Sequence, residues 1–295
     1  MSLLVALVLG IVQGLFMFVP VSSTSHLVLT QTLLREQGVD LPPSDSPEMI
    51  LFDLVVHVGT LVSVLIVMGN GLRELASGVR DDVVSGTLRH DGLGAATSTR
   101  LVLLGLLSVL VTGVLGLTFQ EPLTSVFGSP PAVATALIVT GGLLWWTDLM
   151  TPERGGRRLR FAWRGPAQVT VTVAVLIGVA QAAALTPGLS RSGTTIFAAL
   201  VLGMTRTLAA RYSFYIAIPT ILAATGLQMV LVALDGGFGT VSWAAMGVGF
   251  VTAAAVGTAA LWLVLRLLEA ARFRIFSFYV WALAAVTLAT GLGVE

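Results

Sequence analysis

The sequence predicts an all-α polytopic membrane protein, with six transmembrane helices plus two re-entrant helical hairpins in inverted-topology repeats. Its 295 residues are 56% hydrophobic and 11% charged, and the mean hydropathy is +0.94, which is typical of a chain that lies mostly in lipid. Two short polar stretches, at 13–26 and 181–195, interrupt strongly apolar segments in the two halves of the chain. Arginine gathers in alternate loops, which indicates an orientation for each apolar run.

The composition also excludes several classes of protein. The chain has no cysteine, so it has no disulfides, no thiolate catalysis and no Cys-ligated metal. The net charge of +1 argues against a nucleic-acid partner. The first residues carry no basic side chain and run on into the first polar stretch, so we expect no cleaved signal peptide.

In the first half, one broken apolar segment precedes three complete ones. Residues 3–20 are apolar but end at Pro20 and a cluster of hydroxyls, so we expect a re-entrant hairpin over 1–34. Three spans are expected near 50–69, 101–119 and 131–148. The connections are a polar segment at 35–49, a long polar loop at 70–100 and a turn at 120–130.

The second half repeats this order. A basic loop at 149–167 is followed by a second broken segment at 168–204, which we expect to be the second re-entrant hairpin. Three further spans are expected near 212–233, 241–265 and 275–293. The chain therefore divides into a first repeat at 1–148 and a second, inverted repeat at 149–295, which together form one membrane domain.

The distribution of arginine sets the expected topology. The Arg-rich loops at 70–100, 149–167, 205–211 and 266–274 are expected on the cytoplasmic side. The segments at 35–49, 120–130 and 234–240 are then expected outside. This count of crossings works only if the two hairpins enter the membrane from opposite faces.

The two polar stretches align with each other without a gap. Gln13 falls on Gln181, Ser22 on Ser190, Ser23 on Arg191 and Thr24 on Ser192. A second echo relates 52–61 to 212–221. Polar, helix-breaking stretches are tolerated in the membrane only where they line an enclosed cavity, so this pattern predicts a binding site between the repeats.

Four ionisable residues lie deep in apolar or motif segments, and such residues mark function by default: His26, Asp53, His57 and Arg191. The planar guanidinium of Arg191 suits phosphate oxygens, and the hydroxyls of Ser190 and Ser192 flank it. The break at Pro187-Gly188 could also aim backbone N–H groups at an anion. These features together predict an oxyanion cradle that suits a diphosphate.

Several roles stay open from the residues alone. His26 could be a nucleophile or a general acid/base, and Ser22 and Ser23 are candidate nucleophiles. The hydroxyls of Ser22, Ser23 and Thr24 could instead cap a helix. Arg191 could form a structural ion pair with Asp53, and His57 could form an interhelical hydrogen bond.

At these residues the sequence resembles the undecaprenyl-diphosphate phosphatase family, of the bacitracin-resistance type. The second motif of that family, Pro-Gly-x-Ser-Arg-Ser-Gly-x-Thr, is intact at 187–195. Its first motif, (Glu/Gln)-Gly-x-x-Glu-Phe-x-Pro-x-Ser-Ser-x-Gly-His, matches over 13–26 with two departures. Met17 stands where the family has a catalytic, metal-associated Glu, and Ser25 stands where it has Gly.

The resemblance implies hydrolysis of undecaprenyl diphosphate to the monophosphate and phosphate, which recycles the cell-wall lipid carrier in the bacterial inner membrane. It implies His26, Ser23, Arg191 and Gln13 as catalytic residues. The residues implied for substrate binding are Ser22, Thr24, Ser190, Ser192, Gly193, Thr194 and Gln181. Mg²⁺ or Ca²⁺ is the implied cofactor, for which Asp53 is the only nearby carboxylate candidate, and a homodimer is compatible with the class.

The missing Glu at Met17 leaves two alternatives to a phosphatase. Inverted repeats with broken helices are transporter architecture, so a polyprenyl-phosphate carrier or flippase is the first alternative. An inactive lipid-binding paralogue is the second. Binding needs no carboxylate at residue 17, whereas the hydrolysis implied by the family uses one.

Overall fold

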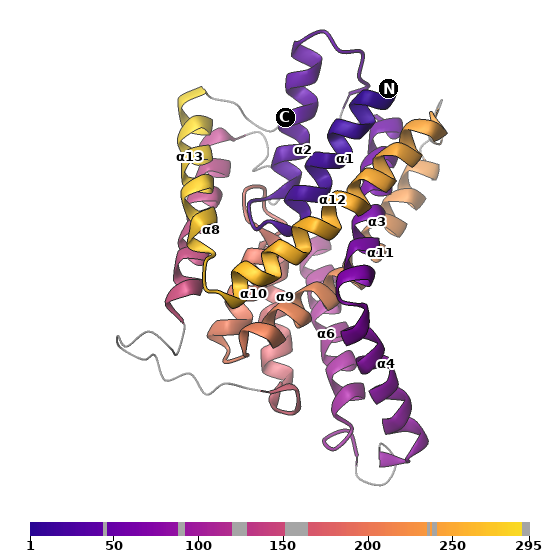
Figure 1. Ribbon diagram of the computed structural model, residues 1–295, viewed down its shortest axis with the longest axis vertical. Helices are drawn as coiled ribbons and strands as arrows, with labels where there is room; N and C mark the ends of the chain where they lie inside the picture. The colour runs from indigo at the N-terminus through magenta and orange to yellow at the C-terminus, as the bar shows by residue number, and fades with distance from the viewer. Residues whose placement is uncertain are drawn as a thin grey trace.

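The structure, a computed structural model, describes residues 1–43, 46–87, 92–119, 129–150, 165–234, 237 and 241–290. Within these ranges the chain forms eleven α-helices, one 3₁₀ turn (Pro166–Gln168) and no β-strand (Figure 1). Five of the described helices are long and apolar enough to cross a membrane. The chain is therefore an all-helical, polytopic membrane protein, as its composition predicts.

Two pairs of shorter helices lie where the broken segments are predicted. They are α1 (Leu3–Phe18) with α2 (Ser23–Glu36), and α9 (Val171–Ala183) with α10 (Arg191–Val201). α1 ends before Pro20 because a residue that precedes proline avoids the helical region, and Val19 is extended. The α9–α10 break turns at Gly188, whose φ of +88° favours glycine. Each break starts a new helix in the protein interior, since Ser22 and Ser190 are buried.

The five long helices coincide with predicted spans: α3 (Pro47–Val67), α6 (Thr97–Thr118), α8 (Pro130–Leu149), α11 (Arg206–Leu234) and α12 (Trp243–Glu269). Ser46 and Ser242 cap the starts of α3 and α12 by accepting a backbone N–H bond. The run near 275–293 forms α13 (Arg274–Thr290), a shorter apolar helix that packs along α8 (Figure 1).

The prediction of a polar loop throughout 70–100 is wrong for its first half. Residues Gly69–Val84 form helix α4, which packs beside α6 (Figure 1). Its apolar residues Leu72, Leu75 and Val79 recur at helical spacing within the charged sequence. The predicted connections at 120–130, 149–167 and 234–240 lie largely outside the described residues.

Close helix crossings hold each hairpin against the other half of the chain. A Cβ atom built on Gly14 of α1 would lie 2.7 Å from the backbone oxygen of Ala253 on α12. A Cβ atom on Gly178 of α9 would lie 2.7 Å from the backbone oxygen of Ser108 on α6. Glycine permits this backbone approach, which is the common way to pack helices in membranes. α1 therefore packs on α12, and α9 packs on α6.

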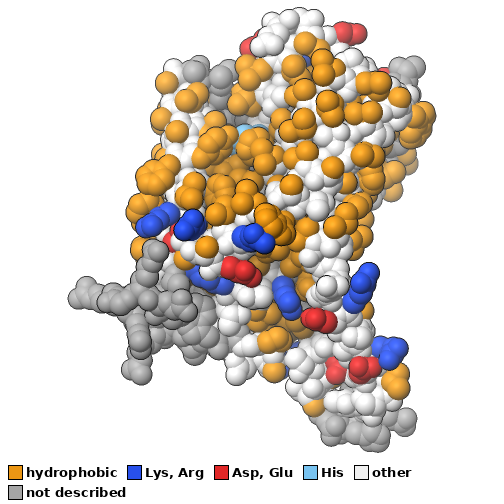
Figure 2. All heavy atoms as spheres, in the orientation of Figure 1, with side chains coloured by type: hydrophobic (Ala, Val, Ile, Leu, Met, Phe, Trp, Pro, Cys, Tyr) orange, Lys and Arg blue, Asp and Glu red, His pale blue; other side chains and the backbone are white. Residues whose placement is uncertain are grey.

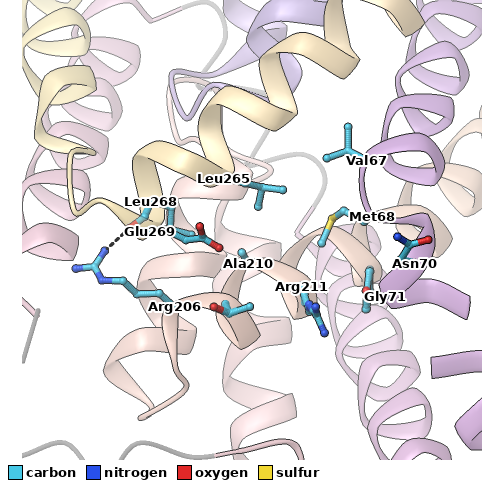
Figure 3. A pocket seen from close by; sticks show the side chains of 12 residues that line it. Val67, Met68, Asn70, Gly71, Arg206, Ala210, Arg211, Leu265, Leu268 and Glu269 are labelled. Atoms are coloured by element: carbon cyan, nitrogen blue, oxygen red, sulfur yellow. Dashed lines mark hydrogen bonds between the residues drawn. The ribbon is translucent and has the colours of Figure 1, made fainter. Parts of the chain in front are cut away.

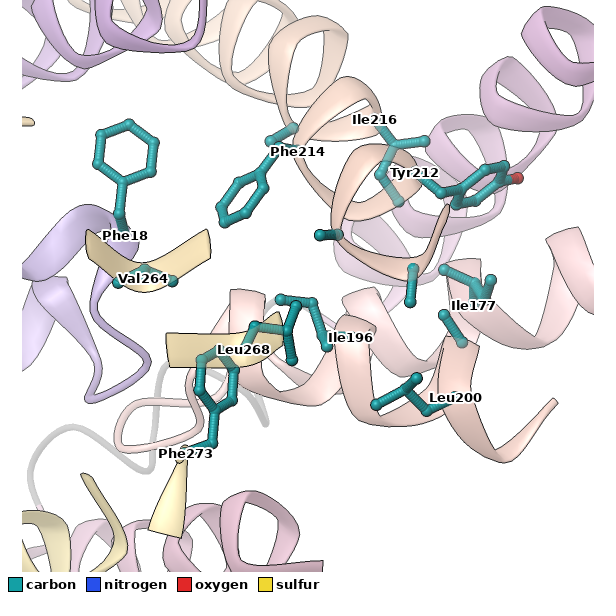
Figure 4. Packing of buried hydrophobic residues seen from close by; sticks show 14 of the residues in the cluster. Phe18, Ile177, Ile196, Leu200, Tyr212, Phe214, Ile216, Val264, Leu268 and Phe273 are labelled. Atoms are coloured by element: carbon teal, nitrogen blue, oxygen red, sulfur yellow. The ribbon is translucent and has the colours of Figure 1, made fainter. Parts of the chain in front are cut away.

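A buried cluster of apolar side chains fills the space between the hairpins and α11 and α12. Phe18, Ile196, Phe214 and Val264 belong to this cluster and come from four different helices (Figure 4). The rings of Phe18 and Phe214 are 5.9 Å apart in an edge-to-face arrangement, which is a favourable geometry for aromatic rings. This cluster anchors the end of α1 directly before its break.

The surface separates apolar from charged side chains along the long axis. Figure 2 shows hydrophobic side chains over the upper part of this face and most of the charged ones in a band across the lower part. The exposed arginines are on α4, α11 and α12, in the turn before α13 and at its first residue: Arg73, Arg80, Arg211, Arg266, Arg272 and Arg274. Exposed leucines, valines and tryptophans elsewhere are what a lipid-facing surface requires.

Candidate active site

A cavity of about 370 Å³ lies where the breaks of both hairpins meet α3 and α11. The first hairpin contributes Phe16, Met17, Ser22, Ser23 and Thr24, and the second contributes Ala184, Leu185, Leu189, Ser190, Arg191 and Ser192. α3 and α11 complete the lining with Leu54, His57, Thr220, Ile221, Ala224, Thr225 and Gln228. The two polar stretches, which are far apart in sequence, therefore form one site.

Two helices start at this cavity, α2 at Ser23 and α10 at Arg191. The first N–H groups of a helix have no partner within that helix, and its dipole places partial positive charge there. At α10 the Ser190 hydroxyl accepts one of these N–H bonds, from Gly193 at 3.2 Å. The remaining amides and the two helix dipoles favour an anion in the cavity.

The backbone at Ser22 is strained. Its φ of 72° and ψ of 89° lie in the left-handed region, which a side chain with a Cβ atom adopts at a cost of about 1–2 kcal/mol. Its hydroxyl makes no capping bond and instead lies 3.1 Å from the hydroxyl of Ser25. Ser22 therefore lines the cavity while its hydroxyl contacts the first turn of α2, and such strain gathers at functional sites.

Arg191 faces the cavity without a carboxylate partner among the described residues. Its Nη2 atom lies 3.8 Å from the Sδ atom of Met17, which is a weak acceptor. Asp53 instead accepts a hydrogen bond from Gln31, at 3.1 Å. The alternative of a structural Arg191–Asp53 ion pair is therefore absent, and the guanidinium remains available for an anionic ligand.

The two aligned glutamines lie behind the cavity lining and are fully buried. The Nε2 group of Gln13 donates to the Met17 sulfur at 3.6 Å. The Nε2 group of Gln181 donates to the hydroxyls of Thr112 and Thr220, both at 3.0 Å. Each glutamine thus supports a residue that lines the cavity, Met17 or Thr220, rather than reaching the cavity itself.

His26 also lies outside the cavity lining in this conformation. Its Nδ1 donates to the backbone oxygen of Ser22 at 2.7 Å, and its Nε2 accepts from the Tyr279 hydroxyl at 2.7 Å. Its ring stacks on Phe16, with the centroids 3.9 Å apart. Both ring nitrogens are therefore engaged by the protein.

The predicted substrate-binding residues divide into two groups. Ser22, Thr24, Ser190 and Ser192 line the cavity, as does the predicted nucleophile Ser23. Gly193 and Thr194 are in the first turn of α10 but are not part of the lining, and the Thr194 hydroxyl is buried with no hydrogen-bond partner among the described residues.

The structure adds lining residues that the motifs do not contain, notably His57, Thr225 and Gln228. His57 carried a signal in the sequence, since it is an ionisable residue within an apolar run. Thr225 and Gln228 carried a weaker one, because they are polar residues within the apolar run of α11. Helical spacing alone does not show which partner each face meets.

The described lining does not fit a divalent cation. Mg²⁺ and Ca²⁺ prefer several oxygen ligands that include carboxylates, and no Asp or Glu is among the lining residues. Asp53 bonds to Gln31, and no group of three metal-ligating side chains occurs in the part of the chain that is described. The guanidinium of Arg191 and the two helix starts instead give the cavity a positive charge, which favours an anion.

A second, smaller cavity of about 200 Å³ lies at the Arg-rich end, between α3, α4, α11 and α12 (Figure 3). Its two arginines are held by other groups of the protein. Arg206 donates to the backbone oxygens of Leu268 and Thr147, both at 2.9 Å, and Arg211 lies 3.7 Å from Glu74. Its lining carries the hydroxyls of Thr207 and Tyr215 alone, whereas seven serines and threonines line the first cavity.

Comparison with known proteins places the chain in a family. The family model described as bacitracin resistance protein BacA matches residues 6–286. The chain is 49% identical to an undecaprenyl-diphosphatase of Alkalilimnicola ehrlichii, over 99% of this chain and 97% of that protein. It is also 49% identical to an undecaprenyl-diphosphatase of Halorhodospira halophila (98% and 97%) and 36% identical to undecaprenyl-diphosphatase 2 of Stutzerimonas stutzeri (100% of each). The chain belongs to the bacitracin resistance protein BacA family.

Proposed function

We propose that the chain is a membrane phosphatase that hydrolyses undecaprenyl diphosphate to undecaprenyl phosphate and phosphate. The observation that carries this function is the cavity itself, where Arg191 and two helix starts converge with a set of hydroxyls. The relatives that cover nearly the whole chain bear the name of this activity. The carrier and inactive-paralogue alternatives gain no comparable support.

In this proposal the diphosphate binds across the two helix starts. The fork of Arg191 donates to oxygens of the terminal phosphate, and the hydroxyls of Ser190 and Ser192 donate beside it. These donors are fixed before the substrate arrives, so they stabilise the charge that develops on the transferred phosphoryl group. Leu185 and Leu189 of the lining are apolar and suit the lipid chain beside its headgroup.

Ser23 is the hydroxyl best placed to attack the terminal phosphorus. It lines the cavity as the first residue of α2, and in the alignment of the two polar stretches it falls on Arg191, the first residue of α10. Its only hydrogen bond among described residues is a long one, 4.0 Å to the Met17 sulfur. For His26 to act as nucleophile, its Nε2 would first have to leave the Tyr279 hydroxyl.

The finer topology is part of the proposal. Six spans and two re-entrant hairpins, in repeats at 1–148 and 149–295, are supported by the reciprocal crossings of α1 on α12 and of α9 on α6. The exposed arginines toward one end support a cytoplasmic position for that end. Gln228 and Thr225 lie toward the opposite end of α11, which supports a site that opens to the outside of the bacterial inner membrane.

The test is phosphate release from undecaprenyl diphosphate by the purified protein in detergent or lipid nanodiscs. We expect turnover by the native chain and its loss when the cradle is altered by Arg191→Ala. Binding of the lipid diphosphate without any phosphate release, by a protein that elutes as a folded species, would instead support a carrier. A chelator arm in the same assay tests whether the activity requires a divalent cation.

A further inference from the structure

We propose that His57 is the general base of this reaction, and that it takes the proton from the Ser23 hydroxyl as this attacks the diphosphate. The inference rests on the proposed phosphatase function. It adds a catalytic residue that neither of the two sequence motifs contains, from α3, which lines the cavity together with both hairpins.

The geometry leaves one nitrogen of His57 for the cavity. Its Nδ1 lies 2.6 Å from the backbone oxygen of Asp53, one helical turn earlier on α3. A carbonyl oxygen only accepts hydrogen bonds, so Nδ1 carries the proton and Nε2 of the neutral ring holds the lone pair. No group in the described part of the chain bonds to Nε2, while the side chain lines the cavity together with Ser23 and Arg191.

His26 is arranged differently, although it lies in the motif. Its two nitrogens bond to Ser22 and Tyr279, both at 2.7 Å, and its ring is stacked against Phe16. The two described histidines thus share one feature, an Nδ1–H bond to the backbone oxygen four residues earlier. They differ at Nε2. In His26 this nitrogen accepts a hydrogen bond from the Tyr279 hydroxyl, whereas in His57 no described group bonds to it.

The cavity also needs a base, because a serine hydroxyl becomes an effective nucleophile only when its proton is removed. Met17, where the resembled motif has Glu, cannot accept it. Among the described lining residues the other polar groups are hydroxyls, the amide of Gln228 and the guanidinium of Arg191. His57 is the only one of them with a basic lone pair.

The two steps of the proposed reaction need no reactant other than the lipid diphosphate and water. As the bond from Ser23 Oγ to the terminal phosphorus forms, Nε2 of His57 takes the hydroxyl proton. The bond from that phosphorus to the bridging oxygen breaks, and undecaprenyl phosphate leaves with the electron pair on that oxygen and takes up the proton. Water then attacks the phosphoserine and gives its proton to Nε2, and Ser23 Oγ leaves as phosphate is released and recovers that proton.

The first test compares His57→Gln with native protein in the phosphate-release assay. Gln can still donate to the Asp53 oxygen but cannot accept a proton, so we expect kcat to fall about 10²- to 10⁴-fold with little change in KM. Ser63→Ala is the matched control, since it removes another buried polar contact of α3, to the Ala254 oxygen at 2.9 Å, away from the cavity. The control should retain turnover.

The second test is rescue of His57→Ala by added imidazole, which a merely structural role would not allow. We expect imidazole to restore turnover in His57→Ala and to leave native turnover unchanged. Near-native turnover by His57→Gln, an equal loss in Ser63→Ala, or no rescue would each overturn the assignment. Absence of activity in the native protein would instead overturn the proposed function itself, so the two failures are distinguishable.

Discussion

The Nη2 atom of Arg191 lies 3.8 Å from the Sδ atom of Met17, so the guanidinium at the start of α10 faces a thioether of α1. Gln13 donates to the same sulfur from behind, at 3.6 Å. A carboxylate at residue 17 would therefore meet both a cation and an amide donor. Met17 leaves the phosphate cradle with a positive charge and without a competing anion.

The first prediction is that Met17→Glu raises the rate of phosphate release. A Glu there supplies an acid/base group next to the diphosphate, and one positioned group contributes on the order of 10²-fold at the lower end of its range. The variant should also become more sensitive to a chelator than native protein, because a carboxylate is the cation ligand that the described lining lacks. Both effects are read from phosphate release with and without chelator.

Met17→Gln is the matched control for this prediction. It has a similar size and adds oxygen and nitrogen without a charge, so it should give neither the gain in rate nor the chelator sensitivity. Equal rates for Met17→Glu and Met17→Gln would contradict the prediction. They would show that a carboxylate at this position adds nothing to catalysis in this chain.

The second prediction concerns Arg191. Arg191→Lys keeps the positive charge but loses the planar fork, so we expect kcat/KM to fall by about 10- to 100-fold, which corresponds to one lost charge-assisted hydrogen bond. Arg80→Lys, at an exposed arginine of α4 that is not part of the cavity lining, should behave as native protein. Near-native kcat/KM in Arg191→Lys would contradict bidentate phosphate binding.

The sequence predicts most of the fold because its signals are strong and local. Apolar runs near 20 residues locate the ends of α3, α6, α8 and α12 to within four residues, and α11 begins six residues before its predicted start. Hydropathy alone does not identify α4, because a helix with many charged residues and no buried residue has the same low hydropathy as a polar loop. The spacing of Leu72, Leu75 and Val79, three and then four residues apart, is the signal that could have identified it.

The site is predicted less completely, for a geometric reason. A motif names residues that cluster in sequence, but residues on the same face of a helix meet different partners along its axis. Ser23 lines the cavity at the start of α2, whereas His26, three residues further along the same face, bonds to Tyr279 on α13. His57 comes from a helix that carries no motif, and only the folded arrangement places α3 at the cavity that both hairpin breaks line.

The third prediction tests the proposed topology. The chain has no native cysteine, so single cysteines can be labelled without background. Asp40→Cys and Arg80→Cys are both at exposed positions, and we expect a membrane-impermeant reagent to label residue 40 from outside and residue 80 only in permeabilised cells. Labelling of both from the same side of intact cells would contradict the count of crossings.

The last prediction tests the close crossing of α1 and α12. Gly14→Ala would place a Cβ atom 2.7 Å from the Ala253 backbone oxygen and 3.0 Å from the Gly257 amide nitrogen, and backbone cannot move aside as the end of a side chain can. Overpacking of this kind costs about 1–3 kcal/mol, so the free energy of unfolding should fall by that amount.

Gly113→Ala on α6 is the matched control, because nothing lies within 4 Å of its added Cβ. Since alanine is the better helix former, the control should be neutral or stabilising by about 0.5–1 kcal/mol. Thermal unfolding in one detergent would measure both variants. A melting temperature for Gly14→Ala as high as that for Gly113→Ala would mean that α1 does not pack against α12 at this distance, and the support of the first hairpin break by that crossing would be lost.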